Sequence, residues 1–166
     1  STLGKRLLAE ELNITTISVH TLGIPDYEQN LIVYNNKDLG ATIASGTFLH
    51  DGMIVLPCSS NTLGAISSGV TNTLVQRAAA VTLKEKRPLV LAHRESPLSL
   101  IDLRNMCTVT EAGAVIAPLS PGFYMIPESI GDMVDFMAGK LADLMGVPHE
   151  CPIRWNSSND QATFVT

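Results

Sequence analysis

The stretch MIVLPCSSNTL at residues 53–63 decides the fold, because an unbroken apolar run passes into small polar residues and then into a helical pattern. The same order returns in LVLAHRESPLS at 89–99 and in AVIAPLSPGFY at 114–124. Apolar runs of four or five residues without polar alternation are typical of strands buried on both faces, as in parallel sheets covered by helices. The sequence therefore predicts an α/β domain built from repeated strand–loop–helix units.

The segments around these strands favour helices. After Thr62, apolar residues return every three or four positions as far as Val81, which predicts one long amphipathic helix that ends before Pro88. Helices are also expected over residues 2–11 and 99–112, the second closed by a glycine. These elements supply the layers that a parallel sheet needs.

A last helix is expected to open at Ser129 and to stop at Gly146. Between 12 and 38 the sequence is polar and irregular, with a short strand expected at 31–34. The predicted helix carries a stripe of apolar residues that we expect to be buried: Ile130, Met133, Val134, Met137, Leu141, Leu144 and Met145.

Composition limits the partners. The chain has 166 residues, of which 45% are hydrophobic and 16% charged, with a net charge of -5. This length fits one domain, expected over 1–147 and followed by a tail at 148–166. The low proportion of charged residues predicts a homo-oligomer, because it leaves more apolar surface than a monomer usually exposes. The negative charge argues against nucleic acid, and the absence of an apolar run of ~20 residues argues against a membrane span.

The cysteines and histidines show no metal-binding spacing. An odd number of scattered cysteines without a C-x-x-C pair predicts reduced thiols and a cytoplasmic location. No metal site is expected, and the pattern assigns no role to any histidine. The residues concerned are Cys58, Cys107 and Cys151, and His20, His50, His93 and His149.

Polar residues follow the first strand where the next helix begins. Ser59, Ser60, Asn61 and Thr62 place hydroxyl and amide groups beside the free N–H groups of a helix start. In open α/β sheets this carboxyl edge is where ligands bind, and a helix start suits anions or polar ring atoms. An ordinary N-cap explains the same residues equally well.

Charged and aromatic residues extend this edge. Arg94 and Glu95 follow the second strand and point to opposite sides of the backbone, so that each could meet a different ligand; a surface ion pair is the alternative. Arg77 and Lys84 are two helical turns apart and could bracket a phosphate, although a solvated helix face is more common. Tyr124 either reaches a ligand or packs over the core.

Six blocks of the sequence together resemble the UbiX-type flavin prenyltransferases, which were long described as aromatic-acid decarboxylases. That family lies within the superfamily of homo-oligomeric flavin-containing cysteine decarboxylases. The resemblance runs from about Ala41 to Gly146 with the blocks in order. The blocks are IASGTF (43–48), DGMIVLPCSSNTL (51–63), RAAAVTLKEKRPLVL (77–91), RESPLS (94–99), AGAVIAP (112–118) and PGFY (121–124).

The resemblance implies a Rossmann-like, flavodoxin-like three-layer sandwich with a parallel sheet, FMN as cofactor and no metal. It further implies a homododecamer with its active site at a subunit interface. The implied reaction moves a dimethylallyl group from dimethylallyl monophosphate to reduced FMN. The product, prenylated FMN, is the cofactor of a UbiD-type decarboxylase.

The resemblance also implies roles for individual residues. Flavin contacts are implied for Ser1, Ser59, Ser60, Asn61, Thr62 and Arg94. Contacts with the prenyl phosphate are implied for Arg77, Lys84, Glu95, Tyr124 and Lys140. Among these, Glu95 is the candidate acid/base for the departing phosphate.

The chain departs from the family pattern at several points. Asn61 stands where a lysine is common, Met-Ile at 125–126 replaces the usual His-Arg, and Lys140 replaces a frequent arginine, which keeps the charge but loses bidentate reach. Ser1 best matches a turn that follows the first strand, phosphate loop, helix and second strand of the family. We therefore expect that a segment preceding Ser1 is missing, including a loop serine that helps the phosphate to leave.

Two other functions compete with this interpretation. One is a flavin-dependent decarboxylase of the same superfamily that acts on a cysteine substrate, although those enzymes lack the RESPLS and PGFY blocks. The other is a non-catalytic flavin-binding or assembly protein that keeps the fold. A visible absorption spectrum of the purified protein separates this last function from the other two, because bound oxidised flavin absorbs visible light.

Overall fold

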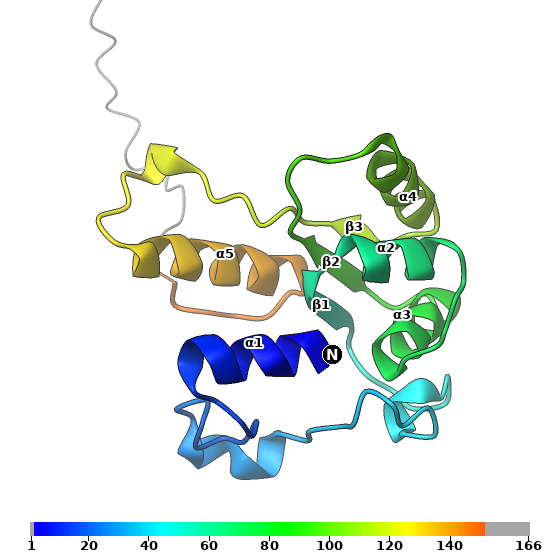
Figure 1. Ribbon diagram of the computed structural model, residues 1–166, viewed down its shortest axis with the longest axis horizontal. Helices are drawn as coiled ribbons and strands as arrows, with labels where there is room; N and C mark the ends of the chain where they lie inside the picture. The colour runs from blue at the N-terminus through cyan, green and yellow to red at the C-terminus, as the bar shows by residue number, and fades with distance from the viewer. Residues whose placement is uncertain (1, 152–166) are drawn as a thin grey trace, which may run out of the picture.

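Three parallel strands form the centre of the protein (Figure 1). The computed structural model describes residues 2–151, without the side chains of the first two of these. The strands are β1 (Met53–Cys58), β2 (Leu89–His93) and β3 (Val115–Ile116), in the order β1-β2-β3. All three predicted strands are therefore present, and every pair is parallel.

The pairing of β1 with β2 aligns their carboxyl ends. Met53 lies opposite Leu89 and Cys58 lies opposite His93, with a register shift between Val55 and Cys58. Pro57 falls inside the shifted segment, where its missing N–H makes a regular ladder impossible. The shift leaves the loops after β1 and β2 side by side at one edge of the sheet.

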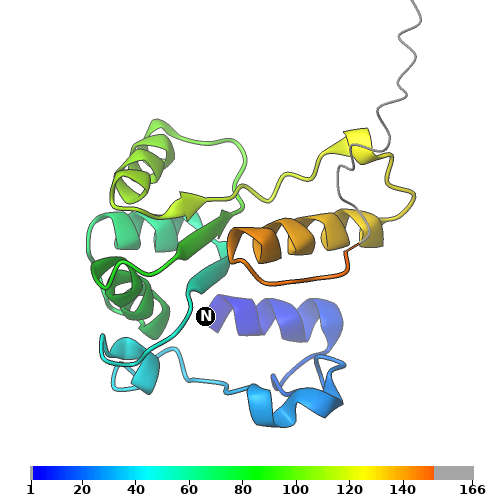
Figure 2. The same ribbon diagram turned by 180° about the vertical axis from the view of Figure 1, so that it is seen from behind.

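Helices cover both faces of the sheet. Helices α2 (Ser60–Ser67), α3 (Leu74–Lys84) and α4 (Leu100–Glu111) lie on one face, and α5 (Ile130–Leu144) lies on the other (Figures 1 and 2). Because side chains alternate along a strand, each strand contributes side chains to the cores on both faces of the sheet. This arrangement is the flavodoxin-like three-layer fold that the sequence predicts.

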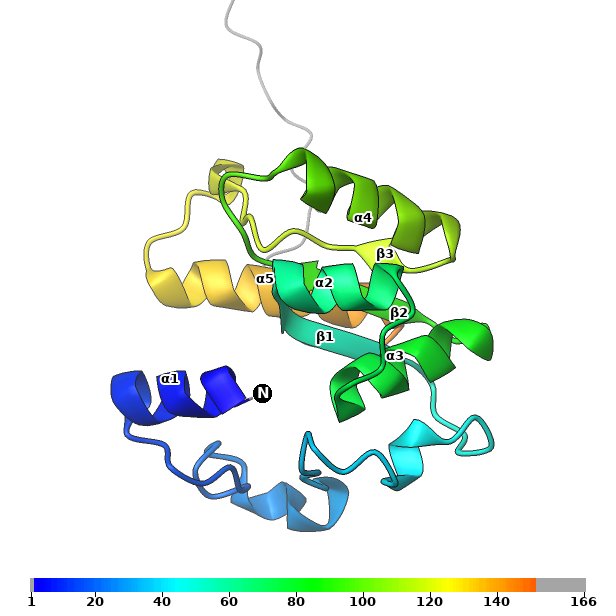
Figure 3. The same cartoon turned by 45° about the vertical axis from the view of Figure 1, so that its right-hand side comes forward.

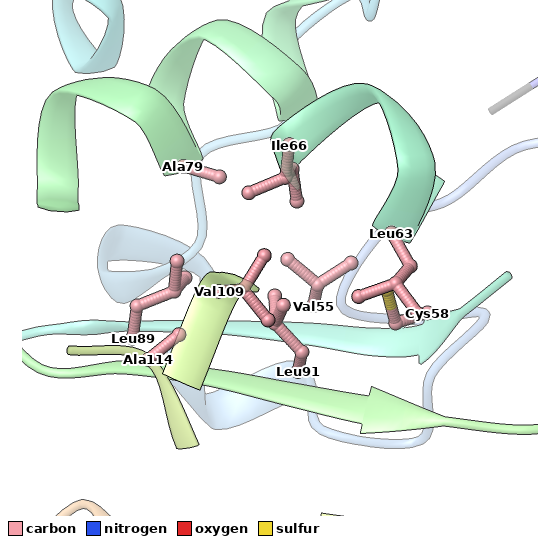
Figure 4. Packing of buried hydrophobic residues seen from close by; sticks show 9 residues of the cluster. All are labelled: Val55, Cys58, Leu63, Ile66, Ala79, Leu89, Leu91, Val109 and Ala114. Atoms are coloured by element: carbon pink, nitrogen blue, oxygen red, sulfur yellow. The ribbon is translucent and has the colours of Figure 1, made fainter. Parts of the chain in front are cut away.

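The alternation is visible in the two cores. Leu89 and Leu91 of β2 join the cluster under α2, α3 and α4, which Figure 4 shows together with Val55 and Leu63. The intervening Val90 and Ala92 pack instead with Leu141 and Ala117 on the α5 side. All five residues of β2 are buried, as expected for the central strand.

The single long helix expected between Thr62 and Pro88 is wrong. The chain leaves α2 at Ser67 and starts α3 at Leu74. Gly69 adopts a φ of +72°, a conformation that glycine reaches without strain and that ends a helix. Thr73 then opens α3 through a capping box with Gln76. Apolar residues return every three or four positions on both sides of this break because α2 and α3 pack on the same core.

Helix α5 has the predicted bounds but not the predicted buried stripe. Ser129 caps its start and Gly146 follows its end with a φ of +67°. Leu141 is buried, yet Ile130 is 79% and Val134 is 60% exposed. Figure 1 shows why, because the amino-terminal half of α5 extends beyond the three strands.

The segment before β1 contains helix α1 (Thr2–Leu12), as predicted, but no strand at 31–34. Two 3-10 helices, η1 (Pro25–Asn30) and η2 (Thr42–Ala44), take up part of it, and Figure 3 shows the segment below the sheet. It is tied to α3 by Asn36, whose side-chain oxygen accepts a hydrogen bond of 3.1 Å from the backbone of Val75.

The proposed division into a domain at 1–147 and a tail at 148–166 stays a prediction. The first residues of that tail pack on α5, where the Sγ of Cys151 donates to the backbone oxygen of Asp135. The rest of it lies outside the described residues. Within residues 2–151, no helix is both long and apolar enough to cross a membrane.

Candidate functional site

Ser59 holds the start of α2. Its backbone is extended, and its Oγ accepts a hydrogen bond of 3.3 Å from the backbone N–H of Thr62. The same hydroxyl donates to the Oγ1 of Thr62 at 3.2 Å. The ordinary N-cap considered above is therefore present. It fixes the first turn of α2, which contains Asn61 and Thr62. The side chain of Asn61 is exposed beside it.

Cys58, directly before this cap, is fully buried. Burial raises the pKa of its thiol to about 11. The group therefore stays a protonated thiol, which is a poor nucleophile. We assign Cys58 a packing role in the cluster under α2.

A polar network around the buried His93 and Asp102 lies under the same helix start, and sequence analysis missed it. Ser60 Oγ lies 3.4 Å from the Nε2 of His93, and both Ser60 and Ser99 hydrogen-bond to Asp102. These hydrogen bonds, that of Ser60 first, lower the pKa of Asp102 to about 2. The sequence offered one signal, since Ser99 and Asp102 have the spacing of a capping box.

The loop after β2 brings Arg94 and Glu95 to the same edge. The backbone N–H of Arg94 donates to the backbone oxygen of Cys58 at 3.3 Å, which joins this loop to the end of β1. Both side chains are exposed, and Glu95 accepts a hydrogen bond of 3.1 Å from the backbone of Ser96. The ion pair between Arg94 and Glu95, considered as an alternative, does not form among the described residues.

Arg77 and Lys84 line a different pocket. They lie on α3 and face the 39–46 segment across a pocket of about 330 Å³. Lys84 also pairs with Glu85 at 3.3 Å, in an exposed ion pair of the kind that contributes ~0–1 kcal/mol. The helical spacing thus places the two cations on one face, as predicted, and the pocket that they line does not include Arg94.

Tyr124 packs against helix α5, and Lys140 lies on that helix. Tyr124 belongs to the 3-10 helix η3 (Phe123–Met125), and its ring stands edge-on to Phe136 of α5, with 6.3 Å between centroids. The ring is still 65% exposed, so it is steadied without being buried. Lys140 is exposed on α5 and has no ion pair within residues 2–151. Ser1 lies outside the described residues.

The larger hollow of the molecule has a different character. A groove of about 620 Å³ runs between the outer side of β1 and α5, and its walls are mostly apolar. Ile54 and Leu56 line it from the strand, and Leu141 and Met145 line it from the helix. Among residues 2–151, none of the predicted site residues lines it. The polar edge after β1 and β2 therefore remains the candidate site.

Comparison with known sequences identifies the family. The Flavoprotein family matches residues 12–143. A flavin prenyltransferase UbiX of Thermoplasma acidophilum is 48% identical over 122 residues, which make up 74% of this chain and 68% of that protein. The UbiX of Pseudomonas aeruginosa is 43% identical over 127 residues, or 76% of this chain and 61% of that protein. The chain thus spans roughly two thirds of the length of these relatives.

Solved structures agree. AnUbiX in complex with FMN and dimethylallyl pyrophosphate superimposes with a TM-score of 0.72 at 42% identity, covering 93% of this chain and 90% of that chain. A dodecameric FMN-dependent UbiX-like decarboxylase of Escherichia coli gives a TM-score of 0.82 at 39% identity, covering 94% and 80%. By sequence and by fold, the chain belongs to the UbiX-type flavin prenyltransferases of the Flavoprotein family.

Proposed function

We propose that the protein transfers a dimethylallyl group from dimethylallyl monophosphate to reduced FMN. The observation that carries this proposal is the meeting of the Ser59–Thr62 cap with Arg94 and Glu95 at the carboxyl edge of β1 and β2. Relatives at 43–48% identity are named flavin prenyltransferases, and a structure with the same fold holds FMN and a dimethylallyl phosphate compound. The product would be prenylated FMN, used by a UbiD-type decarboxylase.

The residues at this edge fit FMN. A flavin ring presents carbonyl oxygens and ring nitrogens, which take hydrogen bonds from N–H, hydroxyl and guanidinium donors. Asn61, Thr62 and Arg94 offer such donors, and the guanidinium of Arg94 is not engaged in an ion pair within residues 2–151. Reduced FMN, when bound, would supply the nucleophilic ring nitrogen that receives the dimethylallyl group.

Glu95 is the proposed proton donor. It follows Arg94 directly, so its side chain can face a second ligand while Arg94 faces the flavin. As the C–O bond of dimethylallyl monophosphate breaks, the electron pair stays with the phosphate, which takes a proton from Glu95. Transfer of a proton in the transition state contributes typically 10²–10⁴-fold to the rate.

The cations that would hold the phosphate come from other elements. Arg77 and Lys84 line a pocket with the 39–46 segment, and Glu95, Tyr124 and Lys140 do not line that pocket. We propose that neighbouring subunits of a homododecamer complete the pocket. The exposed apolar side chains around the loop and η3 support subunit contacts here: Leu98, Leu100, Ile101, Phe123 and Ile126.

We place the reaction in the cytoplasm. Cys58, Cys107 and Cys151 are all free thiols, which is the state expected in a reducing compartment.

The test uses the full chain in two steps. The protein is mixed with FMN, freed of unbound ligand by gel filtration, and its visible spectrum is recorded. The bound flavin is then reduced without oxygen, dimethylallyl monophosphate is added, and the mass of the flavin is measured. We expect retained flavin and a gain of one dimethylallyl unit. Flavin that binds but keeps its mass would overturn prenyl transfer, and no bound flavin would overturn the proposal as a whole.

A further inference from the structure

His93 is a buried histidine with no part in the function proposed so far. It ends β2, its side chain is only 3% exposed, and it directly precedes Arg94. Its backbone is fixed on both sides, since its N–H donates to Ala117 and its carbonyl accepts from Leu119. The imidazole is therefore held at the point where β1, β2 and β3 all reach the candidate site.

The partners of Ser60 determine the direction of the hydrogen bonds. The carboxylate of Asp102 is ionised and can only accept, and it already receives the N–H of Ser99 at 3.0 Å and its hydroxyl at 2.6 Å. The hydroxyl of Ser60 has one hydrogen, which it gives to Asp102. Its oxygen must then accept from His93, whose Nε2 lies 3.4 Å away. This order requires the imidazole to carry its hydrogen on Nε2.

The network joins three elements that all border the site. Ser60 is the first residue of α2, His93 is the last of β2, and Asp102 lies in the first turn of α4. A second contact strengthens the link between the two helices, where Ser67 Oγ donates to the side chain of Asn105 at 2.9 Å. The one hydrogen of the Ser60 hydroxyl is thus given to Asp102 and not to a ligand.

We propose that His93 is a positioning residue which, through Ser60 and Asp102, fixes the first turn of α2 against the loop of Arg94. The flavin contacts of Asn61, Thr62 and Arg94 depend on this spacing, so the inference rests on the proposed function. It revises the role implied for Ser60, which acts through its neighbours and does not touch the flavin itself.

The first test concerns the ligand-free protein and does not depend on flavin. Nitrogen NMR of labelled imidazole should show the hydrogen of His93 on Nε2. In Asp102→Asn the amide can donate to Ser60, which must then donate to His93 and move the imidazole hydrogen to Nδ1. An imidazole that carries its hydrogen on Nδ1 in the parent, or that does not change in Asp102→Asn, would overturn the network.

The second test separates positioning from mere burial. His93→Gln keeps an N–H near the position of Nε2, whereas His93→Leu keeps volume and loses the donor. We expect His93→Leu to exchange the amides of 61–63 with solvent roughly tenfold faster and to weaken FMN binding by a similar factor. His93→Gln should stay within about threefold of the parent. His20→Gln, at an exposed histidine, is the matched control.

The outcomes distinguish the two proposals. A parent protein that binds no FMN overturns the proposed function, while amide exchange still judges the positioning role. If His93→Leu folds, as seen by circular dichroism, and its amide exchange and FMN affinity equal those of the parent, the positioning role is wrong. If His93→Leu does not fold, His93→Gln carries the test, and a loss in that variant of roughly tenfold in amide protection and FMN affinity would count against the positioning role.

Discussion

Lys84 and Glu95 lie beyond opposite ends of strand β2. Lys84 ends α3 shortly before Leu89, and Glu95 follows the last strand residue, His93, by two positions. A strand of this length extends about 16 Å at ~3.3 Å per residue. A monophosphate is far smaller than this distance. We therefore expect both side chains to serve one phosphate only where two subunits meet.

This relationship predicts that two inactive variants complement each other. Lys84→Ala and Glu95→Gln should each lose most of their prenyl transfer activity as pure proteins. After joint unfolding and refolding in equal amounts, random assembly should leave about a quarter of the sites with both parent residues. Activity measured in single turnover should return to roughly that level.

The control for this prediction pairs two changes on the same loop. Arg94→Ala mixed with Glu95→Gln should recover no activity, because both residues serve a site from one subunit and every site keeps one defect. Recovery in this mixture, or none in the first, would contradict the shared pocket.

Replacing the carboxyl of Glu95 should slow the reaction without releasing the cofactor. Glu95→Gln keeps shape and hydrogen bonding, including the bond from the backbone of Ser96, but it removes the titratable proton. We expect flavin occupancy to be unchanged and single-turnover transfer to fall by on the order of 10²-fold or more. Glu111→Gln, at the exposed end of α4, should match the parent in both. Turnover of Glu95→Gln at the parent rate would show that Glu95 has only a structural role.

Asp102 should make the fold sensitive to acid. Hydrogen bonds from Ser60 and Ser99 lower the pKa of Asp102 to about 2, below its value of ~3.9 in an unfolded chain. A carboxyl with a lowered pKa in the folded state stabilises the fold above the unfolded value, and this contribution is lost as pH falls through the folded value. The free energy of unfolding should therefore fall between about pH 4 and pH 2.

Urea titrations across that range would check the effect. Asp102→Asn should be less stable than the parent at neutral pH and should show a flatter dependence on acid. Asp26→Asn changes an exposed carboxylate in η1 and serves as the control. A parent and an Asp102→Asn protein with the same acid dependence would argue against the hydrogen bonds described for Asp102.

Cys58 and Cys107 should differ in reactivity. Cys107 is exposed on α4, whereas burial raises the pKa of Cys58 to about 11 and covers its sulfur. At pH 8 a thiol reagent such as iodoacetamide should modify Cys107 and leave Cys58 unmodified until denaturant is added. Peptide mass mapping would give the two rates. Rapid modification of Cys58 in the native protein would mean that the end of β1 opens to solvent.

The strands were predictable because burial on both faces leaves its mark in the sequence as an unbroken apolar run. The break between α2 and α3 was not, since Leu63 and Ile66 of α2 and Ala79 of α3 face one core, and apolar residues return every three or four positions on both sides of the break. The exposure of Ile130 depends on how far the sheet extends beneath α5, which no local pattern encodes.

The candidate site was predictable in part. The residues after β1 and β2 could be placed together because parallel strands end at one edge. The contact of Ser60 with His93 and Asp102 could not, because it joins residues more than 30 positions apart and no sequence pattern gives His93 or Asp102 a role at the site. The distance between Lys84 and Glu95 likewise depends on the direction of a strand and not on a motif.

The break between α2 and α3 also separates two parts of the chain that can vary independently. One side carries the cap at Ser59, and the other carries Arg77 and Lys84. Each doubling of a flexible loop costs only about 0.6 kcal/mol of closure entropy, so insertions at 68–73 would be tolerated. During evolution, the phosphate-binding cations on α3 could therefore change while the capped start of α2 stays the same.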